Sequence, residues 1–161
     1  MNYEIVMATA ADSAEILALY KAQLGREFCP WNEFYPTQEE IEYDLSRDAL
    51  FVLKSDGRIK ATVSIEVADD LERLDFWDDS LLPVGELVRL AVLPEEQNKG
   101  LARVILRFGL EELKRRGFRG IRFLVNKHNE KAIRSYAAFG FHLAGEAHIY
   151  EQDFLCYEGK L

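Results

Sequence analysis

Cysteine, histidine and long apolar runs are scarce in this chain, and each shortage excludes a class of protein. Two cysteines among 161 residues, Cys29 and Cys156, are too few and too far apart for a disulfide framework, so we expect free thiols in a reducing cytoplasm. Neither has a neighbouring feature that would activate a thiolate. His128, His142 and His148 lack the spacing of metal ligands. We therefore predict neither a metal site nor a cysteine nucleophile.

Composition and charge narrow the class further. No apolar stretch approaches membrane-spanning length, and residues 1–13 lack the basic region and apolar core of a secretory signal. The content of 48% hydrophobic and 30% charged residues is typical of a soluble globular protein, and 161 residues predict one domain, residues 1–161. The net charge of −8 argues against a nucleic-acid partner. We expect a cytoplasmic protein with no membrane and no nucleic-acid partner.

Two segments of the sequence carry recognisable chemistry. Glu86–Ala102 reads ELVRLAVLPEEQNKGLA, an apolar run that stops at Pro94 and opens into a Gln-x-x-Gly-x-Ala turn before an amphipathic helix. Such a turn points unpaired N–H groups in one direction, as a phosphate site requires, and Gly100 presents no Cβ to a ligand. Val125–Phe141 reads VNKHNEKAIRSYAAFGF, the end of a strand at Asn126 followed by a short helix.

Together these segments resemble the Gcn5-related N-acetyltransferase (GNAT) family. Its main signature, Arg/Gln-x-x-Gly-x-Gly/Ala after a Leu-x-Val-x-Pro strand, is matched by Leu90, Val92, Pro94, Gln97, Gly100 and Ala102. Its second motif is matched by Val125, Asn126, Asn129, Ala132, Tyr136, Gly140 and Phe141. A glycine turn alone is a weak signal, but two motifs in the right order are specific. Matches to the family's motifs lie in about the second half of the chain.

The resemblance implies acetyl-coenzyme A as co-substrate. The pyrophosphate would bind N–H groups between Gln97 and Ala102, and the helix dipole would assist. The pantetheine arm would lie between two splayed parallel strands, hydrogen-bonded along Leu90–Val92, with Asn126 on the facing strand. The implied coenzyme-binding residues are Leu90, Ala91, Val92, Gln97, Asn98, Lys99, Gly100, Leu101, Ala102, Asn126 and Asn129.

Several of these residues also have a purely structural interpretation. Gly100 would serve equally in a plain tight turn at a helix start. Lys99 would contact a phosphate or stay solvated. Asn129 would bind the coenzyme or cap the helix that starts near Glu130, or do both.

The resemblance also implies two catalytic residues. The amine must lose a proton and the leaving thiolate must gain one, and both are general acid–base roles. Tyr136, whose phenol has a reference pKa of about 10, would be the acid. Glu86 would be the base that relays the amine proton through water. Alternatively, Tyr136 would pack under Phe139 and Phe141, and Glu86 would be an acid at the solvent-exposed end of its strand. Water and the backbone would then deprotonate the amine.

The acceptor would bind opposite the coenzyme, beside the first two helices and the loop before the central strand. Trp31, Tyr35 and Trp77 are the predicted substrate-binding residues. The loop is acidic, with Asp69, Asp70, Glu72, Asp75, Asp78 and Asp79. This charge would favour a cationic amine, or the loop is simply solvated, with its aromatic residues anchored in the core. Arg89 interrupts an apolar strand and needs an acidic partner, such as Glu66.

Periodicity, caps and turns predict an α/β fold with the order β-α-α-β-β-β-α-β-α-β-β. The expected strands are Tyr3–Met7, Leu50–Lys54, Arg58–Val67, Gly85–Leu93, Gly120–Asn126, Phe141–Ala144 and Asp153–Tyr157. The expected helices run from Thr9 or Asp12 to about Leu24, from the Thr37–Glu40 capping box to about Ser46, and over Leu101–Arg116 and Glu130–Phe139. The order predicts a mixed sheet with helices on both faces, and the resemblance makes it a single acetyltransferase-type domain.

The predicted function is direct transfer of an acetyl group from acetyl-coenzyme A to a primary amine in a ternary complex. The partner would be a small-molecule amine or a peptide amine, and a homodimer stays open. An alternative is a non-catalytic acyl-coenzyme A-binding or sensing domain, against which Tyr136 argues. A structural dimerisation module would leave the Gln97–Ala102 turn unexplained. The sequence leaves both the acceptor and the length of the acyl group open.

Overall fold

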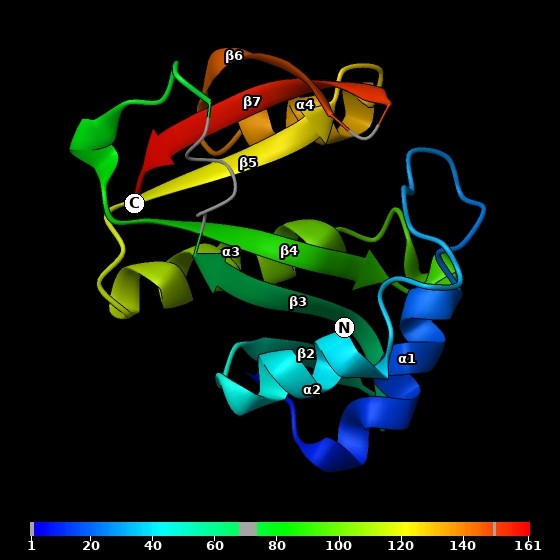
Figure 1. Ribbon diagram of the computed structural model, residues 1–161. Coiled ribbons are helices and arrows are strands. Elements are labelled where there is room, and N and C mark those ends of the chain that lie inside the picture. The colour runs from blue at the N-terminus through cyan, green and yellow to red at the C-terminus, as the bar shows by residue number, and fades with distance from the viewer. Residues whose placement is uncertain (1, 68–73, 150) are drawn as a thin grey trace. The chain divides into compact units, whose positions relative to one another are not determined.

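The computed structural model describes residues 2–67, 74–149 and 151–161 (Figure 1). Its strands are β1 (Glu4–Met7), β2 (Leu50–Ser55), β3 (Arg58–Val67), β4 (Val84–Val92), β5 (Gly120–Asn126), β6 (His142–Ile149) and β7 (Gln152–Lys160). Its α-helices are α1 (Ser13–Lys21), α2 (Gln38–Ser46), α3 (Leu101–Arg115) and α4 (Glu130–Ala137). The element order confirms the predicted one.

One mixed sheet contains these strands in the order β1-β2-β3-β4-β5-β7-β6. β4 and β5 are parallel, as predicted from the helix that connects them, whereas the β1–β2, β2–β3, β5–β7 and β6–β7 pairs are antiparallel. The chain divides into two compact units, residues 1–65 with 87–109 and residues 66–86 with 110–161. We call them the first and the second unit.

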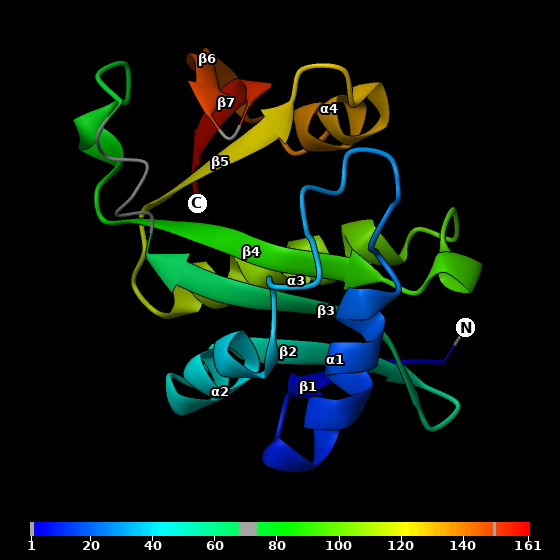
Figure 2. The same ribbon diagram turned by 45° about the vertical axis from the view of Figure 1, so that its right-hand side comes forward.

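The first unit is built around the β2–β3 hairpin. Its turn is Asp56-Gly57, both with positive φ (54° and 73°), as the predicted two-residue hairpin requires. α1 and α2 lie on one face of these strands and the first turns of α3 on the other, as Figures 1 and 2 show. Since both faces are covered, β2 is almost entirely buried.

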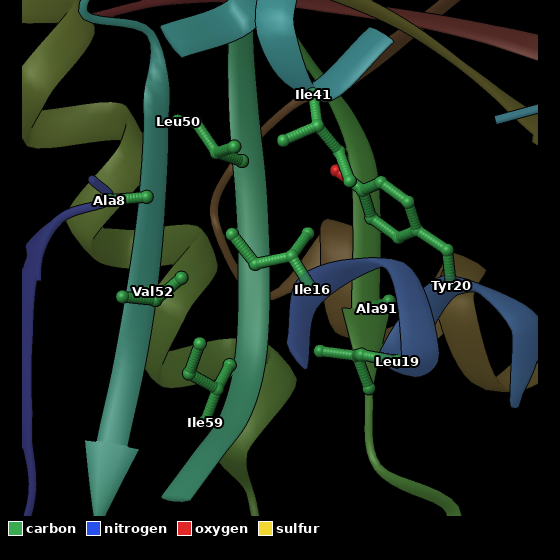
Figure 3. Packing of buried hydrophobic residues seen from close by; sticks show 9 residues of the cluster. All are labelled: Ala8, Ile16, Leu19, Tyr20, Ile41, Leu50, Val52, Ile59 and Ala91. Atoms are coloured by element: carbon green, nitrogen blue, oxygen red, sulfur yellow. The ribbon is translucent and has the colours of Figure 1, made fainter. Parts of the chain in front are cut away.

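The core of the first unit lies between β2, β3 and the two N-terminal helices. Figure 3 shows side chains from α1, α2 and the strands converging there, namely Ala8, Ile16, Leu19, Tyr20, Ile41, Leu50, Val52, Ile59 and Ala91. α2 is held in place by the predicted capping box: Thr37 Oγ1 accepts from the Glu39 N–H at 3.2 Å, and Glu40 Oε2 accepts from the Thr37 N–H at 2.6 Å. These contacts fix the helix from which the acidic residue Asp44 projects.

The second unit places α4 on one face of β5. Phe123 of β5 contacts Tyr136 of α4 with ring centroids 4.4 Å apart, and it also packs against Phe141 and Tyr157. On the other face Trp77, Val84 and Cys156 form a second cluster of buried residues. The alternation of side chains along β5 thus separates the aromatic cluster of Tyr136 from the cluster of Trp77.

The last two strands are longer than predicted. β6 and β7 cover His142–Ile149 and Gln152–Lys160, whereas the expectation was limited to Phe141–Ala144 and Asp153–Tyr157. The β6–β7 register shifts between Leu143 and Gly145, so the alternation of polar and apolar residues is broken there. Gly145 lies where a Cβ would come within 2.4 Å of the Phe76 ring. Only glycine fits against this ring, and a glycine in a strand weakens the sequence signal.

Candidate active site

The predicted site residues fall into two groups, one in each unit. The first unit contains Trp31, Tyr35, the β4 segment Leu90–Val92 and the turn Gln97–Ala102. The second contains Trp77, Glu86, Asn126, Asn129 and Tyr136. Asp69, Asp70 and Glu72 of the acidic loop lie outside the described residues.

In the first unit, a turn after β4 leads the chain into α3. A short 3₁₀-helix covers Pro94–Glu96, and Asn98 and Gly100 then adopt positive φ values of 63° and 82°. A Cβ built on Gly100 would meet nothing within 4 Å, so this glycine borders open space and is needed for its backbone conformation. Close approach of a ligand to the Gly100 backbone stays a prediction.

Helix α3 begins directly after Gly100. The Val104 N–H donates to the Gly100 carbonyl oxygen at 3.1 Å, which makes Gly100 the residue before the first helical turn. The N–H groups of the first turn, beginning with Leu101 and Ala102, have no acceptor within a helix. Gly100 has no side chain to cap them. The Gln97 N–H differs, because it donates to the Pro94 carbonyl at 3.4 Å, so the set of N–H groups begins after Gln97 rather than at it.

Side chains that the sequence analysis did not identify hold this turn. Glu96 is buried and accepts from Lys60 Nζ at 2.8 Å and from Lys99 Nζ at 2.9 Å. Hydrogen bonds from Lys60 and then from Lys99 keep the pKa of Glu96 below its usual range. Arg26 donates to Gln97 Oε1. The side chains of Lys99 and Gln97 therefore make contacts within the protein, and phosphate binding by the main chain of the turn stays a prediction.

The β4 segment Leu90–Val92 precedes this turn. Gln23, a buried side chain of the first unit, donates through Nε2 to the Val92 carbonyl at 2.9 Å and to the Leu19 carbonyl at 3.3 Å. One lone pair of the Val92 carbonyl is therefore used inside the protein. Leu90 and Ala91 keep their predicted assignment to the pantetheine arm.

Arg89 departs from the predicted continuous strand. Its φ of 50° is left-handed, which is unusual for a residue with a Cβ and interrupts the alternation of β4. Its predicted acidic partner is present, and the acid that the structure shows is Asp44 of α2: Arg89 Nε and Nη2 donate to the two carboxylate oxygens at 2.9 and 2.7 Å. Ser64 and Arg47 also donate to Asp44, at 2.6 and 2.7 Å. A contact of Arg89 with Glu66, the acid named as an example, stays a prediction.

Asp44→Ala should lower the free energy of unfolding by about 3–5 kcal/mol, because it leaves the buried Arg89 guanidinium without its carboxylate. Urea denaturation would show a lower midpoint with an unchanged slope. Glu42→Ala is the matched control, since Glu42 is an exposed carboxylate on the same helix. Equal midpoints for the two variants would contradict a structural role for the Asp44–Arg89 pair.

In the second unit, the two asparagines make local hydrogen bonds. Asn129 caps α4, with Oδ1 accepting from the Ala132 N–H at 3.2 Å, as one of its two interpretations predicted. Asn126 donates to Gln152 Oε1 at 2.9 Å and accepts from the His128 N–H at 2.9 Å. These bonds fix both side chains at the end of β5, and a coenzyme contact by either stays a prediction.

Tyr136 and Glu86, the predicted acid and base, also belong to the second unit. The Tyr136 ring packs on Phe123, and burial raises the pKa of its phenol above the usual value of about 10. The phenol is therefore protonated through the neutral range, as a general acid must be. Glu86 lies half-buried in β4.

The three predicted acceptor residues differ in exposure. Trp31 packs against the first core, with its ring 5.4 Å from that of Tyr20. Trp77 is 8% exposed in the second core, with the Arg122 guanidinium 5.2 Å from its ring centroid. This burial favours the alternative in which Trp77 anchors its loop. Tyr35 is 41% exposed, and its hydroxyl accepts from Arg89 Nη1 at 2.9 Å.

Two described acids of the loop, Asp78 and Asp79, have structural partners. Asp78 Oδ1 accepts from the Ser80 N–H at 2.9 Å, which caps a short 3₁₀-helix at Asp79–Leu81. Asp79 lies 3.5 Å from Arg122, although the Asp79 side chain is 86% exposed. The main-chain N–H of Asp78 donates to the buried Glu158. The loop is thus tied to the second unit, and steering of a cationic acceptor by its charge stays a prediction.

Comparison with known proteins decides the family. A model of the acetyltransferase (GNAT) family matches residues 14–141, which is most of the chain. The chain belongs to the GNAT family. Mycothiol acetyltransferase of Thermobifida fusca (strain YX) is 32% identical over 108 residues, 66% of this chain and 32% of that protein. The chain therefore matches only about a third of the length of this curated relative.

Solved structures show that the GNAT fold extends beyond the segment that the family model matches. A ribosomal-protein-alanine N-acetyltransferase from Brucella melitensis superposes with a TM-score of 0.80 at 20% identity, covering 98% of this chain and 99% of that one. The Salmonella typhimurium protein yncA, solved with its cofactor acetyl-CoA, gives 0.76 at 20% identity, covering 100% and 95%. The resemblance noted from the two sequence motifs and the predicted α/β fold are both confirmed.

The cysteines, candidate metal ligands and helices of this GNAT protein bear on further expectations from the sequence. Burial raises the pKa of the Cys156 thiol to about 11, so this thiol is protonated at neutral pH, and Cys29 is half-buried. Within residues 2–67, 74–149 and 151–161 no group of three or more His, Cys, Asp or Glu side chains is arranged to hold a metal ion. None of the helices in these ranges combines the length and apolar character that crossing a bilayer requires.

Proposed function

We propose that this chain transfers an acetyl group from acetyl-coenzyme A to a primary amine, by direct attack in a ternary complex. The observation that supports this most strongly is the GNAT family match combined with the Gly100 entry to α3, where the first N–H groups have no acceptor within the helix. Phosphates prefer such helix entries, where N–H groups and the helix dipole act together. Acetyl-coenzyme A supplies both the pyrophosphate and the activated acetyl group.

The proposed binding roles follow the order of the coenzyme's parts. The pyrophosphate accepts hydrogen bonds from the main chain between Asn98 and Ala102. The side chains of Gln97 and Lys99 stabilise the turn through their contacts within the protein. The pantetheine arm hydrogen-bonds along β4 at Leu90 and Ala91. Asn126 and Asn129 are proposed to contact the coenzyme as well as the main chain.

The proposed chemistry moves two protons. The amine nitrogen forms a bond to the thioester carbon while the carbon–sulfur bond breaks. Glu86 takes the amine proton, directly or through water, and Tyr136 gives a proton to the departing sulfur. The raised pKa of Tyr136 suits it to hold that proton until the thiolate forms. Solvent restores both groups afterwards.

The test is release of free thiol from acetyl-coenzyme A in the presence of an amine panel, together with the melting temperature of the protein. A bound coenzyme should raise the melting temperature by mass action. The alternative function, an acyl-coenzyme A-binding or sensing domain, would show the same thermal shift with no thiol released for any amine. Absence of both effects would contradict both functions.

Glu86→Gln should remove the acidic limb of the pH profile of kcat/KM. The carboxylate must be ionised to accept a proton, so the wild-type rate should rise with pH as Glu86 titrates, whereas the carboxamide cannot accept one. Profiles with two amines of different basicity provide the control, because a limb that belongs to the substrate moves with the amine. If Glu86→Gln has the same acidic limb as wild type, Glu86 is not the base, and water and the backbone would deprotonate the amine.

We also propose that residues 1–161 act as one acetyltransferase domain in the cytoplasm, with a homodimer as an open assembly state. The free, widely separated cysteines Cys29 and Cys156 are consistent with a reducing compartment. Size-exclusion chromatography with light scattering would determine the assembly.

A further inference from the structure

A buried ion pair of the first unit supports one exposed hydroxyl. Asp44 is fully buried and receives hydrogen bonds from the Arg89, Ser64 and Arg47 side chains. Burial tends to lower the pKa of the Arg89 guanidinium, but hydrogen bonds and charge from Asp44 outweigh this effect and raise it. The Arg89 guanidinium is therefore a permanent, fixed cation, and its third described contact is the hydroxyl of Tyr35 at 2.9 Å.

Arg89 reaches this arrangement through a strained backbone. Its left-handed φ of 50° costs roughly 1–2 kcal/mol for a residue with a Cβ, and such strain persists only where surrounding contacts enforce it. The enforcing contact is the two-point bond to Asp44. Position 89 directly precedes the β4 residues Leu90 and Ala91, to which the pantetheine arm is assigned. The strain therefore lies next to the β4 segment to which the pantetheine arm is assigned.

Tyr35 is held from its main chain as well as from its hydroxyl. It closes a tight turn in which the Asn32 and Tyr35 N–H groups each donate to the other residue's carbonyl, at 3.1 and 3.2 Å. The Asn32 side chain accepts from the Phe34 N–H at 2.7 Å. Tyr35 is nevertheless 41% exposed, so it is both ordered and accessible.

The direction of the Tyr35 hydroxyl follows from its chemistry. A phenol oxygen has one proton to donate and lone pairs to accept with. Arg89 occupies the acceptor side, and among the described residues no oxygen or nitrogen accepts the Tyr35 proton. The cation beside the hydroxyl, Arg89, is balanced by the carboxylate of Asp44, 2.7 Å from the Arg89 guanidinium. Tyr35 thus presents a fixed, uncharged donor, which suits an oxygen rather than a second amine.

We propose that the Tyr35 hydroxyl, positioned by the Asp44–Arg89 pair, donates a hydrogen bond to a carbonyl oxygen of the acceptor. This inference rests on the proposed function and names its substrate class: amines that carry a carbonyl a few bonds from the nitrogen, as amino acid amides and peptide N-termini do. Tyr35 touches the substrate, whereas Arg89 and Asp44 are positioning residues. A plain alkylamine or polyamine has no group to accept this bond.

The test compares L-alaninamide with isopropylamine, in which a methyl group replaces the carboxamide. The wild-type protein should have the higher kcat/KM for L-alaninamide. Tyr35→Phe should lower that value about five- to tenfold, the effect of one hydrogen bond, and leave the value for isopropylamine and the KM for acetyl-coenzyme A unchanged. The two amines differ in basicity, with reference pKa values of about 8 for an α-amine and about 10.4 for an alkylamine. This difference cancels when the ratio of the two rates is compared between enzymes.

Two further variants separate recognition from folding. Tyr43→Phe is the matched control, because Tyr43 is a 52% exposed tyrosine of the same unit. Its ratio of kcat/KM for L-alaninamide to kcat/KM for isopropylamine should equal that of wild type. Arg89→Lys keeps the charge beside Asp44, but one ammonium cannot hold both Asp44 and Tyr35 as the guanidinium does. It should lose the preference for L-alaninamide, measured as the ratio of the rates with L-alaninamide and isopropylamine. A purely structural defect would lower both rates by the same factor.

The outcomes distinguish this inference from the function on which it rests. If L-alaninamide is acetylated but the ratio of the two kcat/KM values is equal in wild type and Tyr35→Phe, the role of Tyr35 would be overturned. Turnover of putrescine or isopropylamine in preference to L-alaninamide would overturn the substrate class and leave the proposed function standing. No thiol release with any of these amines would overturn both.

Discussion

Gly100→Glu is expected to abolish binding of acetyl-coenzyme A. The substitution places a carboxylate beside the first N–H groups of α3, where the coenzyme pyrophosphate would otherwise accept their hydrogen bonds. The added side chain occupies space that is open in the wild-type protein and repels the phosphates. At a coenzyme concentration of about 100 Kd, wild type should gain about 2.7 kcal/mol of stability, or roughly 5–10 °C in melting temperature, and the variant should gain nothing.

The control for this variant must share its backbone strain. Gly57→Glu does so, because Gly57 also has a positive φ, 73° against 82° for Gly100, and a Cβ at either position meets nothing within 4 Å. Both variants should lose stability to a similar extent, since each forces a Glu into a conformation that suits glycine. Only Gly57→Glu should retain the coenzyme-dependent thermal shift. A full shift in Gly100→Glu would exclude this turn from the phosphate site.

Tyr136→Phe is expected to lower kcat by about 10²–10⁴-fold, the usual effect of losing a general acid. The phenylalanine keeps the ring on Phe123, so folding and coenzyme affinity should be almost unchanged. The matched control is Tyr157→Phe, since Tyr157 is buried in the same aromatic cluster and stacks on Phe123 at 5.5 Å. A kcat within a few-fold of wild type in both variants would assign Tyr136 to packing.

The pH dependence of kcat gives an independent check on Tyr136. Burial raises its pKa above the usual value, so its proton is fully present through the neutral range and is lost only as the pH rises through the raised pKa. Wild-type kcat should therefore stay level through the neutral range and fall only as the pH rises through the raised pKa of Tyr136. Tyr136→Phe should lack this alkaline fall. The measurement needs an acceptor that is already deprotonated below pH 9.

The order of helices and strands followed from local signals in the sequence. The Thr37–Glu40 capping box, the Asp56-Gly57 turn and Gly117 at the end of α3 each act within a few residues of where they appear. Gly117 has a φ of 96°, and the Phe118 N–H returns to the Leu113 carbonyl, as in a helix that ends on glycine. Such features are predictable because the sequence contains all of their parts.

Features that depend on distant residues were not predictable in the same way. Arg89 was expected to need an acid, but Asp44 lies on a helix that precedes it by 45 positions, and one sequence cannot rank Asp44 above other acids. The left-handed conformation of Arg89 was missed for the same reason, since its cause is the tertiary bond to Asp44. Trp77 could equally have lined a cleft or filled a core, and only the packing distinguishes these. The Lys60–Glu96 pair, which contacts the turn before α3, was likewise not predicted because it joins residues 36 positions apart.

The states of the two cysteines determine how cleanly a single turnover can be counted. Coenzyme A appears as one new thiol per reaction, and aromatic disulfide reagents report every accessible thiol in the sample. Cys156 is fully buried and protonated, so it should be silent to such reagents while the protein is folded, whereas half-buried Cys29 contributes a background. A Cys29→Ser variant should show no protein thiol to the reagent. With enzyme and acetyl-coenzyme A at equal concentrations, the first thiol detected would then be the coenzyme A released in the first turnover. A later thiol signal from Cys156 would indicate unfolding.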